Sequence, residues 1–271
     1  MKAIVLGLVA LLFAGSASAH DLNLTGPLIQ GGLIQGATEP GAEVLFNGRA
    51  VRVSEAGLFL IGFGRDDTGP FDLEVRHPDG GVTRRSMVIE ARQYDIQRID
   101  GLPQNMVSPD AATVARIQRE SAAIAAARAI DTAEPLFASG FLWPAIGPIS
   151  GVYGSQRILN GEPKQPHFGV DVANPTGSPV TAPADGIVVL AENDLFYTGG
   201  TVMLDHGHGL TTAFLHMSSV TVRLNQRVAQ GDLIGRIGAT GRVTGAHLDW
   251  RVNLFKTRLD PQLLVGPMPA E

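Results

Sequence analysis

The stretch TGAHLDWRV, residues 244–252, places a histidine and an aspartate two positions apart in an apolar run. Its β-branched and aromatic end, with Trp250 and Val252, is typical of a β-strand. In a strand, residues i and i+2 lie on the same face, with Cα atoms about 6.6 Å apart. His247 and Asp249 therefore share a face. Both could converge on one metal ion, or one could bind the ion while the other acts on a water molecule.

Histidine and aspartate recur in HFGVD, where His167 and Asp171 lie four positions apart. In a straight strand these two would share a face but lie about 13 Å apart. Ligands of one zinc ion lie about 2 Å from the metal, and hence within roughly 4 Å of each other. The chain must bend if the two residues share an ion, and Gly169 allows that bend. Pro166 favours an entry from a loop into the strand.

Five of the seven histidines lie between positions 167 and 247. His206 and His208 flank a glycine in DHGHG, whose composition predicts a turn. Asp205 is expected to form the same turn. His216 follows a β-rich run near a strand end. Taken alone, such a residue is more typical of a structural histidine than of a catalytic one.

The composition limits the chemistry. A length of 271 residues suits about two domains, and 33 glycines with few aromatic residues favour strands and turns over long helices. A net charge of −5 argues against nucleic-acid binding, which needs a basic surface. The chain has no cysteine, so it has no disulfide, no thiol chemistry and no lipid-modified cysteine. Any metal must be held by His, Asp or Glu, and no glycine-rich nucleotide motif opens a helix.

Residues 1–19 have the features of a signal peptide. Lys2 forms the positive start, residues 4–14 form a short apolar run, and the small residues 17–19 form a cleavage site. The apolar run is too short for a bilayer, which needs about 20 residues. We expect an exported, periplasmic protein that starts near His20 and has no transmembrane segment.

Residues 20–95 are expected to form an immunoglobulin-like β-sandwich. Asn47 and Gly48 separate two β-rich runs in AEVLFNGRAVRV, a strong hairpin signal. Residues 78–81, Pro-Asp-Gly-Gly, separate two further runs in FDLEVRHPDGGVTRRSMVIE. His77 lies beside that turn and is expected to be exposed. We find no catalytic cluster in this region.

Residues 96–140 are expected to be a helical connector. The stretch SPDAATVARIQRESAAIAAARAI, residues 108–130, has apolar positions near helical spacing. Ser108 is the predicted cap, Pro109 the first helical residue, and Asp110 complements the positive helix end. The helix is expected to be rigid and to pack against its own domains. After residue 140, short strands such as GTVMLDHG and LTTAFLH predict a mostly antiparallel sheet.

Residues 141–262 resemble the M23 metallopeptidase family, the lysostaphin-like or LytM-type peptidoglycan endopeptidases. The resemblance is carried by WPAIGPISGVYGSQR, HFGVDVANPTGSPVTAPADGIV, LDHGHGL, FLHMSS and VAQGDLIGRIGATGRVTGAHLDW. It implies a peptidase domain of the duplicated-hybrid-motif type, with a groove over an antiparallel sheet and one zinc ion. Residues 263–271 are then a C-terminal tail. The front region with YDIQRIDGLPQNMVSP is similar to the accessory region of exported proteobacterial members.

The resemblance also implies roles for residues. His167 and Asp171 would be zinc ligands. His216 and His247 would be the catalytic pair that does not bind metal, with His247 as general base and His216 steadying the water or the oxyanion. Family members usually end the pattern in His-x-His, and the second histidine is the third ligand. Here that position is Asp249.

Aspartate is a legitimate zinc ligand, but a second carboxylate makes the centre less positive. We therefore expect a weaker or slower zinc site at Asp249, which would also admit manganese or iron. The implied function is zinc-dependent hydrolysis of peptide cross-links in peptidoglycan, with Tyr153 and Arg157 lining the groove. The alternative is a weak or inactive module, free of metal, that binds the cell wall or activates a separate amidase. Other cell-wall enzymes are then candidate partners.

Overall fold

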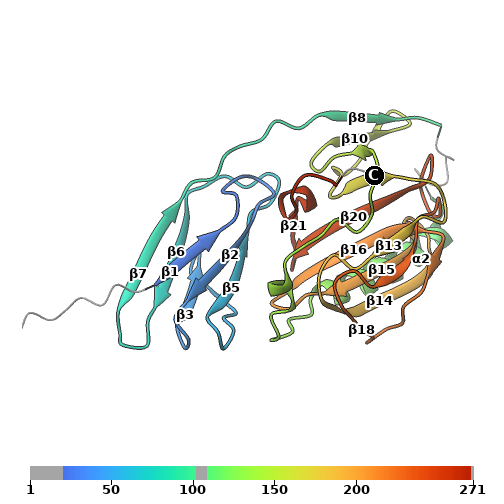
Figure 1. Ribbon diagram of the computed structural model, residues 1–271. Helices are drawn as coiled ribbons and strands as arrows, with labels where there is room; N and C mark the ends of the chain where they lie inside the picture. Colours follow the sequence, from blue (N-terminus) through green and yellow to red (C-terminus); the bar gives the residue numbers. More distant parts are fainter. Residues whose placement is uncertain (1–20, 102–108, 270–271) are drawn as a thin grey trace, which may run out of the picture.

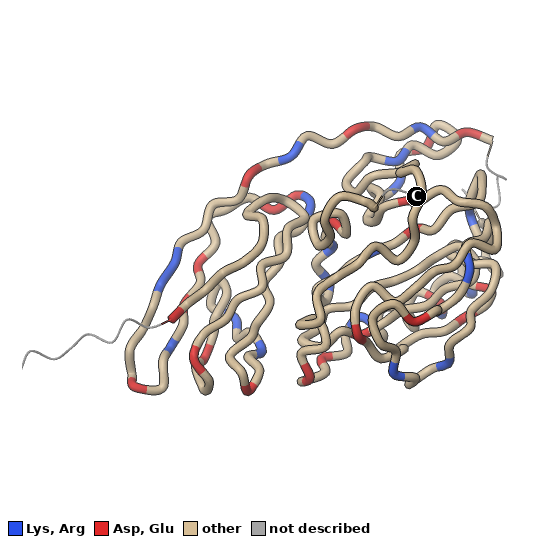
Figure 2. Tube along the Cα trace, in the orientation of Figure 1, with Lys and Arg blue, Asp and Glu red and all other residues tan. Residues whose placement is uncertain are grey.

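A computed structural model describes residues 21–101 and 109–269. Two units follow one another along the chain (Figure 1). The front unit contains the first seven strands, and the larger C-terminal unit holds one broad sheet. Basic and acidic residues are spread over both units, and neither sign is confined to one of them (Figure 2). Among the residues described, no helix is both long and apolar enough to cross a bilayer.

Two antiparallel sheets form the front unit. One has the order β1-β2-β5 and the other β4-β3-β6-β7. Their bounds are β1 Leu22–Thr25, β2 Leu33–Thr38, β3 Glu43–Phe46, β4 Arg49–Val51, β5 Leu58–Gly62, β6 Phe71–Arg76 and β7 Val82–Met87. Buried side chains of both sheets, Phe59 and Leu73 among them, form one core. The predicted mostly-β fold is confirmed, and the likeness to immunoglobulin domains stays a prediction.

Both predicted hairpins of the front unit are present. Asn47 and Gly48 have φ of 48° and 72° and connect β3 to β4. Positive φ at both positions is what a two-residue hairpin loop requires. The Pro-Asp-Gly-Gly turn connects β6 to β7. The prediction for His77 beside that turn was wrong, because the residue is only 4% exposed.

The ring of His77 is buried because polar groups from elsewhere bind both of its nitrogens. Nδ1 contacts the carboxylate of Glu39, and Nε2 lies 2.8 Å from Thr83 Oγ1. Buried polar groups of this kind are tolerated when they are hydrogen-bonded. The sequence placed the residue near a turn but did not reveal these partners.

The segment predicted to be a connector adds a strand and a helix to the C-terminal unit. Strand β8 (Ile96–Ile99) pairs in parallel with β10 (Gln156–Leu159), which also pairs with β11 (Glu162–Pro163). Helix α2 spans Ala111–Arg128. Its cap is Asp110, whose Oδ1 accepts from the Thr113 amide at 2.7 Å.

The predicted start of this helix therefore needs correction. Pro109 precedes the cap and is not the first helical residue. Ser108, the predicted cap, lies outside the described residues. The carboxylate of Asp110 takes the capping role because it reaches a free backbone amide of the first turn. The apolar side of α2 packs on the broad sheet, where Ile124 and Ala127 meet Leu195, Ala213 and Leu215.

The broad sheet has the order β18-β14-β15-β16-β20-β12-β9, and β21 also pairs with β20. The strands are β9 Ile149–Gly151, β12 Val170–Ala173, β14 Gly186–Leu195, β15 Gly199–Asp205, β16 Leu210–Met217, β18 Arg227–Val228, β20 His247–Leu254 and β21 Thr257–Leu259. Every pairing in this sheet is antiparallel, as predicted.

The two faces of the broad sheet differ in chemistry. Along β20, Leu248, Trp250 and Val252 are fully buried in an apolar core. A smaller sheet of β13 (Pro179–Thr181), β19 (Leu233–Arg236) and β17 (Ser219–Val220) contributes to the same core. Because side chains alternate along a strand, His247 and Asp249 lie on the opposite face. The short helices η1 (Leu136–Ser139) and η2 (Pro261–Leu263) flank this unit.

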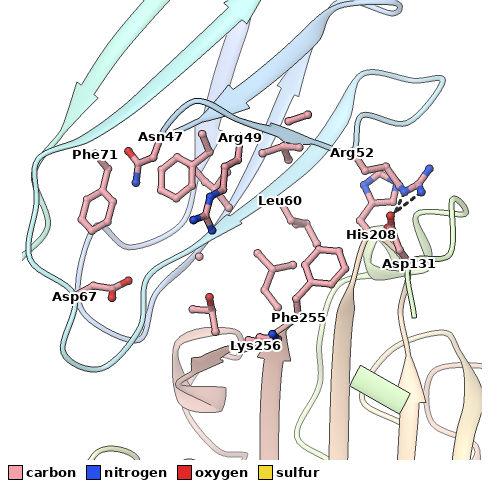
Figure 3. Close-up of a pocket in the computed structure, with 17 residues that line it drawn as sticks. Asn47, Arg49, Arg52, Leu60, Asp67, Phe71, Asp131, His208, Phe255 and Lys256 are labelled. Atoms are coloured by element: carbon pink, nitrogen blue, oxygen red, sulfur yellow. Dashed lines mark hydrogen bonds and ion pairs between the residues drawn. The ribbon is translucent and has the colours of Figure 1, made fainter. Parts of the chain in front are cut away.

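The two units are joined by polar and apolar contacts. Arg52 donates two hydrogen bonds of 2.7 Å to Asp131, which follows α2 (Figure 3). Arg92 Nη1 donates to Asp260 Oδ2 at 2.7 Å. A cavity of about 700 Å³ lies at this junction, lined by Leu60 and Phe255 among others (Figure 3). The front unit is thus held against the C-terminal unit by these contacts.

Candidate metal centre

The structure brings His167, Asp171 and Asp249 together. His167 Nε2 lies 3.1 Å from Asp171 Oδ1 and 3.4 Å from Asp249 Oδ2. One donor atom from each residue lies within 4.8 Å of the others, and all three residues are buried. The pairing of β12 with β20 sets Asp171 directly opposite Asp249. The bend expected between positions 167 and 171 is present, since His167 precedes the strand that carries Asp171.

Glycine is needed at this bend for space. A Cβ on Gly169 would lie 2.4 Å from Asp249 Oδ1. The backbone φ of Gly169 is outside the left-handed region, so conformational freedom is not the reason for glycine here. On the other side, a Cβ on Gly151 would lie 2.2 Å from Asp171 Oδ2. We expected backbone freedom to explain Gly169, but close approach of the carboxylate explains it. The two glycines leave room for both carboxylates to reach His167.

Two of the three residues have donor atoms without a well-formed hydrogen bond within the chain. His167 Nδ1 has no partner, and His167 Nε2 and Asp171 Oδ1 face each other at 3.1 Å without a well-aligned hydrogen bond. An unpartnered buried polar atom costs about 1–3 kcal/mol, so most such atoms are satisfied. One imidazole and two carboxylates are ligand types that Zn²⁺ accepts. The residues present therefore fit a divalent metal ion.

Two arginines offset the charge of the carboxylates. Arg251 donates to both oxygens of Asp249, at 2.9 and 2.6 Å. Arg157 Nη2 lies 3.3 Å from Asp171 Oδ2. Burial alone would raise the pKa of Asp249, but Arg251 and His167 hold it well below its usual value. The charge of Arg251 thus offsets that of the second carboxylate, and the expectation of a weaker zinc site at Asp249 stays a prediction.

Sequence reasoning missed Arg251. The signal was available, because Arg251 follows Asp249 by two positions on the same strand face. The two carboxylates also change the pKa of the His167 imidazole. Burial would lower the pKa of His167, but the charges of Asp249 and Asp171 raise it overall.

His216 and His247 lie beside the three converging residues. Their ring centroids are 4.9 Å apart, and His247 Nε2 is 3.8 Å from Asp171 Oδ1. His216 Nδ1 bonds the Thr240 carbonyl at 2.8 Å, and His247 Nδ1 bonds the Gly245 carbonyl at 2.9 Å. A carbonyl only accepts, so Nδ1 carries the proton in both neutral rings. Each Nε2 is then free to accept a proton or a hydrogen bond.

His216 has two further features of a functional residue. Burial lowers its pKa to about 4, so the ring is neutral at ordinary pH. Its backbone has a φ of 67°, in the left-handed region that is uncommon outside glycine. Strained backbone is often kept at active sites. The structure therefore places His216 in the cluster, although its sequence context alone favoured a structural role.

The other two histidines of this unit have structural partners. His206 Nδ1 donates to the Asp185 carbonyl at 2.6 Å, and its Nε2 lies 2.8 Å from Thr212 Oγ1. His208 Nε2 donates to the Ala133 carbonyl at 3.1 Å. Both belong to the loop between β15 and β16, as the turn prediction indicated, and both are buried.

A groove of about 160 Å³ runs past the centre. Asp171, His216 and His247 line it, together with Arg157 and the side chain of Gln97 from β8. The predicted groove position of Arg157 agrees with this lining. The contribution of β8 was not foreseen, because its parallel pairing with β10 is a tertiary contact.

The predicted groove position of Tyr153 was wrong. The side chain is 1% exposed, and its hydroxyl donates to the Arg258 carbonyl at 2.8 Å. Its ring lies between those of Tyr94 and Phe168, with centroids 6.3 and 6.4 Å away. Tyr153 is therefore part of the packing between the two units.

Known proteins are similar to this chain in sequence and fold. The model of peptidase family M23 matches residues 165–261, which contain all five site residues. A crystal structure of a putative M23 peptidase from Pseudomonas aeruginosa is 31% identical, covering 88% of this chain and 95% of that chain with a TM-score of 0.68. The chain belongs to peptidase family M23. Because the match includes most of the front unit, the overall M23 architecture with its N-terminal strands is shared with that protein.

Two named relatives of this M23 chain match over shorter regions. Peptidoglycan DD-endopeptidase ShyA of Vibrio cholerae is 44% identical over 87 residues, which is 32% of this chain and 20% of the relative. Cell division protein DipM of Caulobacter vibrioides is 33% identical over 142 residues, 51% of this chain and 22% of the relative. The matched regions are thus about a fifth of the length of these relatives.

Proposed function

We propose that this M23 chain hydrolyses peptide cross-links in peptidoglycan with a bound Zn²⁺ ion. The observation that carries the proposal is the convergence of His167, Asp171 and Asp249, beside two imidazoles whose Nε2 atoms are free. His167 and Asp171 also have buried donor atoms that form no well-aligned hydrogen bond. The name of ShyA supports the substrate class, since that relative is a peptidoglycan DD-endopeptidase.

Each residue has a role that follows from its geometry. His167 Nε2 and one oxygen each of Asp171 and Asp249 would hold the metal. When bound, zinc polarises the carbonyl of the cleaved bond and acidifies a water molecule. Arg157 and Arg251 keep the two carboxylates in place through the hydrogen bonds described above. Such partners of ligands typically affect affinity or activity by about 10–100-fold.

His247 is the general base in this proposal. Its Nδ1 proton is directed to the Gly245 carbonyl, so Nε2 can take a proton from water next to Asp171. His216 orients that water by accepting a hydrogen bond at Nε2. The other role considered, stabilising an oxyanion, needs a donor at Nε2. A pKa of about 4 disfavours the doubly protonated ring that would supply one.

One observation favours the alternative function. Arg251 already binds both oxygens of Asp249, so the chain itself supplies a cation where an ion would bind. Under the alternative, the unit would be a module without metal that binds the cell wall or activates another enzyme. A carboxylate has about four acceptor sites, however, and can bind Arg251 and a metal together.

Metal analysis with a cell-wall digestion assay separates the two functions. We expect about one zinc per wild-type chain and release of soluble peptides from purified peptidoglycan. His167→Ala and Asp249→Ala should lose both. Glu192→Ala, which removes an exposed carboxylate on β14, is the matched control and should keep both. A wild-type protein that contains no metal after incubation with zinc, and digests nothing, would exclude the hydrolase.

We also propose export to the periplasm. The support is the signal-peptide pattern of residues 1–19, which lie outside the described residues, and the cell-wall substrate named for a relative. Expression in a Gram-negative host followed by N-terminal sequencing should give a periplasmic protein that starts near His20. Retention of Lys2 in a cytoplasmic product would contradict the proposal.

A further inference from the structure

Five arginines line a cavity between helix α2 and strands β20 and β21. The cavity has a volume of about 350 Å³. We call it the arginine pocket, after its arginines Arg128, Arg157, Arg242, Arg251 and Arg258. His216 lines both this pocket and the groove beside the metal centre, as do Arg157 and Arg242. The two spaces therefore adjoin each other.

The pocket continues the polar face of β20. His247, Asp249, Arg251 and Asn253 alternate with core residues and share this face. Asn253 lies opposite Arg258 in the pairing of β20 with β21. One strand face thus leads from the proposed general base, past the metal ligand, to the arginines. Helix α2 packs on this side of the broad sheet and contributes Arg128 to the lining of the pocket.

Three of the acidic groups nearby are already engaged. Asp249 binds Arg251, and Asp171 lies against Arg157. Glu120 lines the pocket, but one of its oxygens accepts from Arg116 Nε at 2.5 Å. Its other oxygen accepts from the Phe196 amide at 2.8 Å. These carboxylates leave a positive surplus in the pocket.

Arg128 and Arg258 have no carboxylate within ion-pair distance among the described residues. Arg258 Nη1 donates to the neutral Asn253 side chain at 2.8 Å. Arg128 Nε is buried and has no hydrogen-bond partner at all. Charged groups are rarely buried in proteins unless they are paired. Two guanidinium groups in one cavity therefore lack the partner that such groups usually have.

The electrostatic cost of this arrangement is visible in the pKa values. Burial, and then the charge of Arg251, lower the pKa of Arg128 to about 10. Burial, followed by the charges of Arg128 and Arg251, lowers the pKa of Arg258 to about 9. Both groups stay protonated at neutral pH, but their charged forms are destabilised. An anion that entered the pocket would relieve this repulsion.

We propose that the arginine pocket binds a free carboxylate of the peptide substrate and makes this chain selective for peptides that carry one near the cleaved bond. The planar, forked guanidinium group matches a carboxylate with two parallel hydrogen bonds. The choice of a peptide carboxylate rests on the proposed hydrolase function, because the pocket adjoins the groove through His216. The carboxylate comes either from the peptide C-terminus or from an acidic residue within the peptide.

Three synthetic cross-linked peptides test the proposal with the zinc-loaded mature protein. The first has all carboxylates free, the second has an amidated C-terminus, and the third has its internal carboxylates amidated. We expect kcat/KM to fall at least tenfold for one of the amidated peptides, mainly through KM. The peptide that loses activity identifies the source of the carboxylate. Equal kcat/KM for all three peptides would overturn the proposal.

Arg128→Gln and Arg258→Gln assign the selectivity to the pocket. Each should lower kcat/KM for the free peptide by about 10–100-fold and leave the value for the discriminated amide unchanged. Arg119→Gln, on the exposed side of the same helix, is the matched control and should keep the wild-type preference. Arg128→Gln should fold with an unchanged or higher Tm, since it removes an unpaired charge from a partly buried site. Variants that keep the wild-type preference would overturn the proposal.

Calorimetry keeps the pocket testable if the wild-type protein cleaves none of the peptides. That result would contradict the proposed hydrolase function. The pocket would still be supported by binding of the free peptide at least tenfold tighter than its amide, with the difference lost in Arg128→Gln. Equal binding of acid and amide would overturn it. Preference for inorganic phosphate over the free peptide, at equal concentration and ionic strength, would also overturn it.

Discussion

His167 and His206 lie in the same unit, at 1% and 0% exposure, yet their surroundings differ in one respect. Both ring nitrogens of His206 bind groups of the chain, the Asp185 carbonyl and the Thr212 hydroxyl. His167 Nδ1 has no partner, and its Nε2 faces the carboxylates of Asp171 and Asp249 at 3.1 and 3.4 Å without a well-aligned hydrogen bond. Burial alone therefore does not distinguish a structural histidine from a candidate ligand.

The difference between the two histidines affects the free energy of folding. A satisfied buried imidazole stabilises the loop that surrounds it, whereas an unpartnered one is destabilising until something binds it. His208 and His216 both have positive φ, and they line different spaces: His208 lines the cavity at the junction of the two units, whereas His216 lines the groove beside the metal centre. Substitutions at His167, His206 and Asp249 test this contrast.

Removal of His167 should have the largest effect on function. We expect His167→Ala to lose bound zinc and at least about 1,000-fold in turnover, because a ligand matters more than the partners of ligands. Its Tm should fall, since the variant loses the stabilising metal, leaves a cavity and deprives two buried carboxylates of the imidazole that faces them. Metal analysis, peptidoglycan digestion and calorimetry measure these quantities. A stable protein with full zinc content would contradict the assignment of His167 as a ligand.

Removal of His206 should have the opposite effect. His206→Ala leaves a cavity and deprives two buried polar groups of their partner, which should cost about 2–4 kcal/mol of unfolding free energy. Zinc content per folded chain should remain at the wild-type value. Denaturant unfolding and metal analysis provide the two readings. If this variant lost its metal while keeping its stability, the contrast between the two histidines would be reversed.

The pH dependence of stability should reflect His206. Burial lowers its pKa from 6.5 to about 4, so between these values the unfolded chain binds a proton that the folded chain does not. The contribution of His206 to the free energy of unfolding is fully present above about pH 6.5. It decreases by about 3 kcal/mol as the pH falls towards 4. Unfolding of wild type and His206→Ala at a series of pH values should show a shallower acid slope for the variant. Identical slopes would exclude His206 as a source.

Asp249 lies between the two cases, because its carboxylate is bound by Arg251 and also faces His167. Asp249→Asn keeps the shape and removes the charge. We expect zinc affinity to fall by about 10–100-fold, the smallest of these effects. The variant Asp249→His is a poorer test, since it also leaves Arg251 without its partner. Zinc titration of wild type and Asp249→Asn measures the change, and unaltered affinity would remove Asp249 from the ligand set.

Much of the local structure could be predicted from the sequence. The loop at Asn47 and Gly48 follows from the positive φ that its hairpin requires, and the shared face of His247 and Asp249 follows from strand geometry. The need for a bend between His167 and Asp171 followed from the reach of metal ligands. These are short-range rules, and the family motifs placed the same residues in one domain.

The tertiary structure alone decided which of these groups are satisfied. In the tertiary structure, His77 and Tyr153 are buried, and helix α2 packs on the face of the broad sheet that carries the site. Arg128 lacks a counter-charge among the described residues, and its Nε has no hydrogen-bond partner. The sequence determined the residue types and their local spacing. Whether a buried donor finds an acceptor depends on residues far away in the chain, such as Asp185 for His206. Hydrogen bonding and charge pairing are settled only when distant segments pack together.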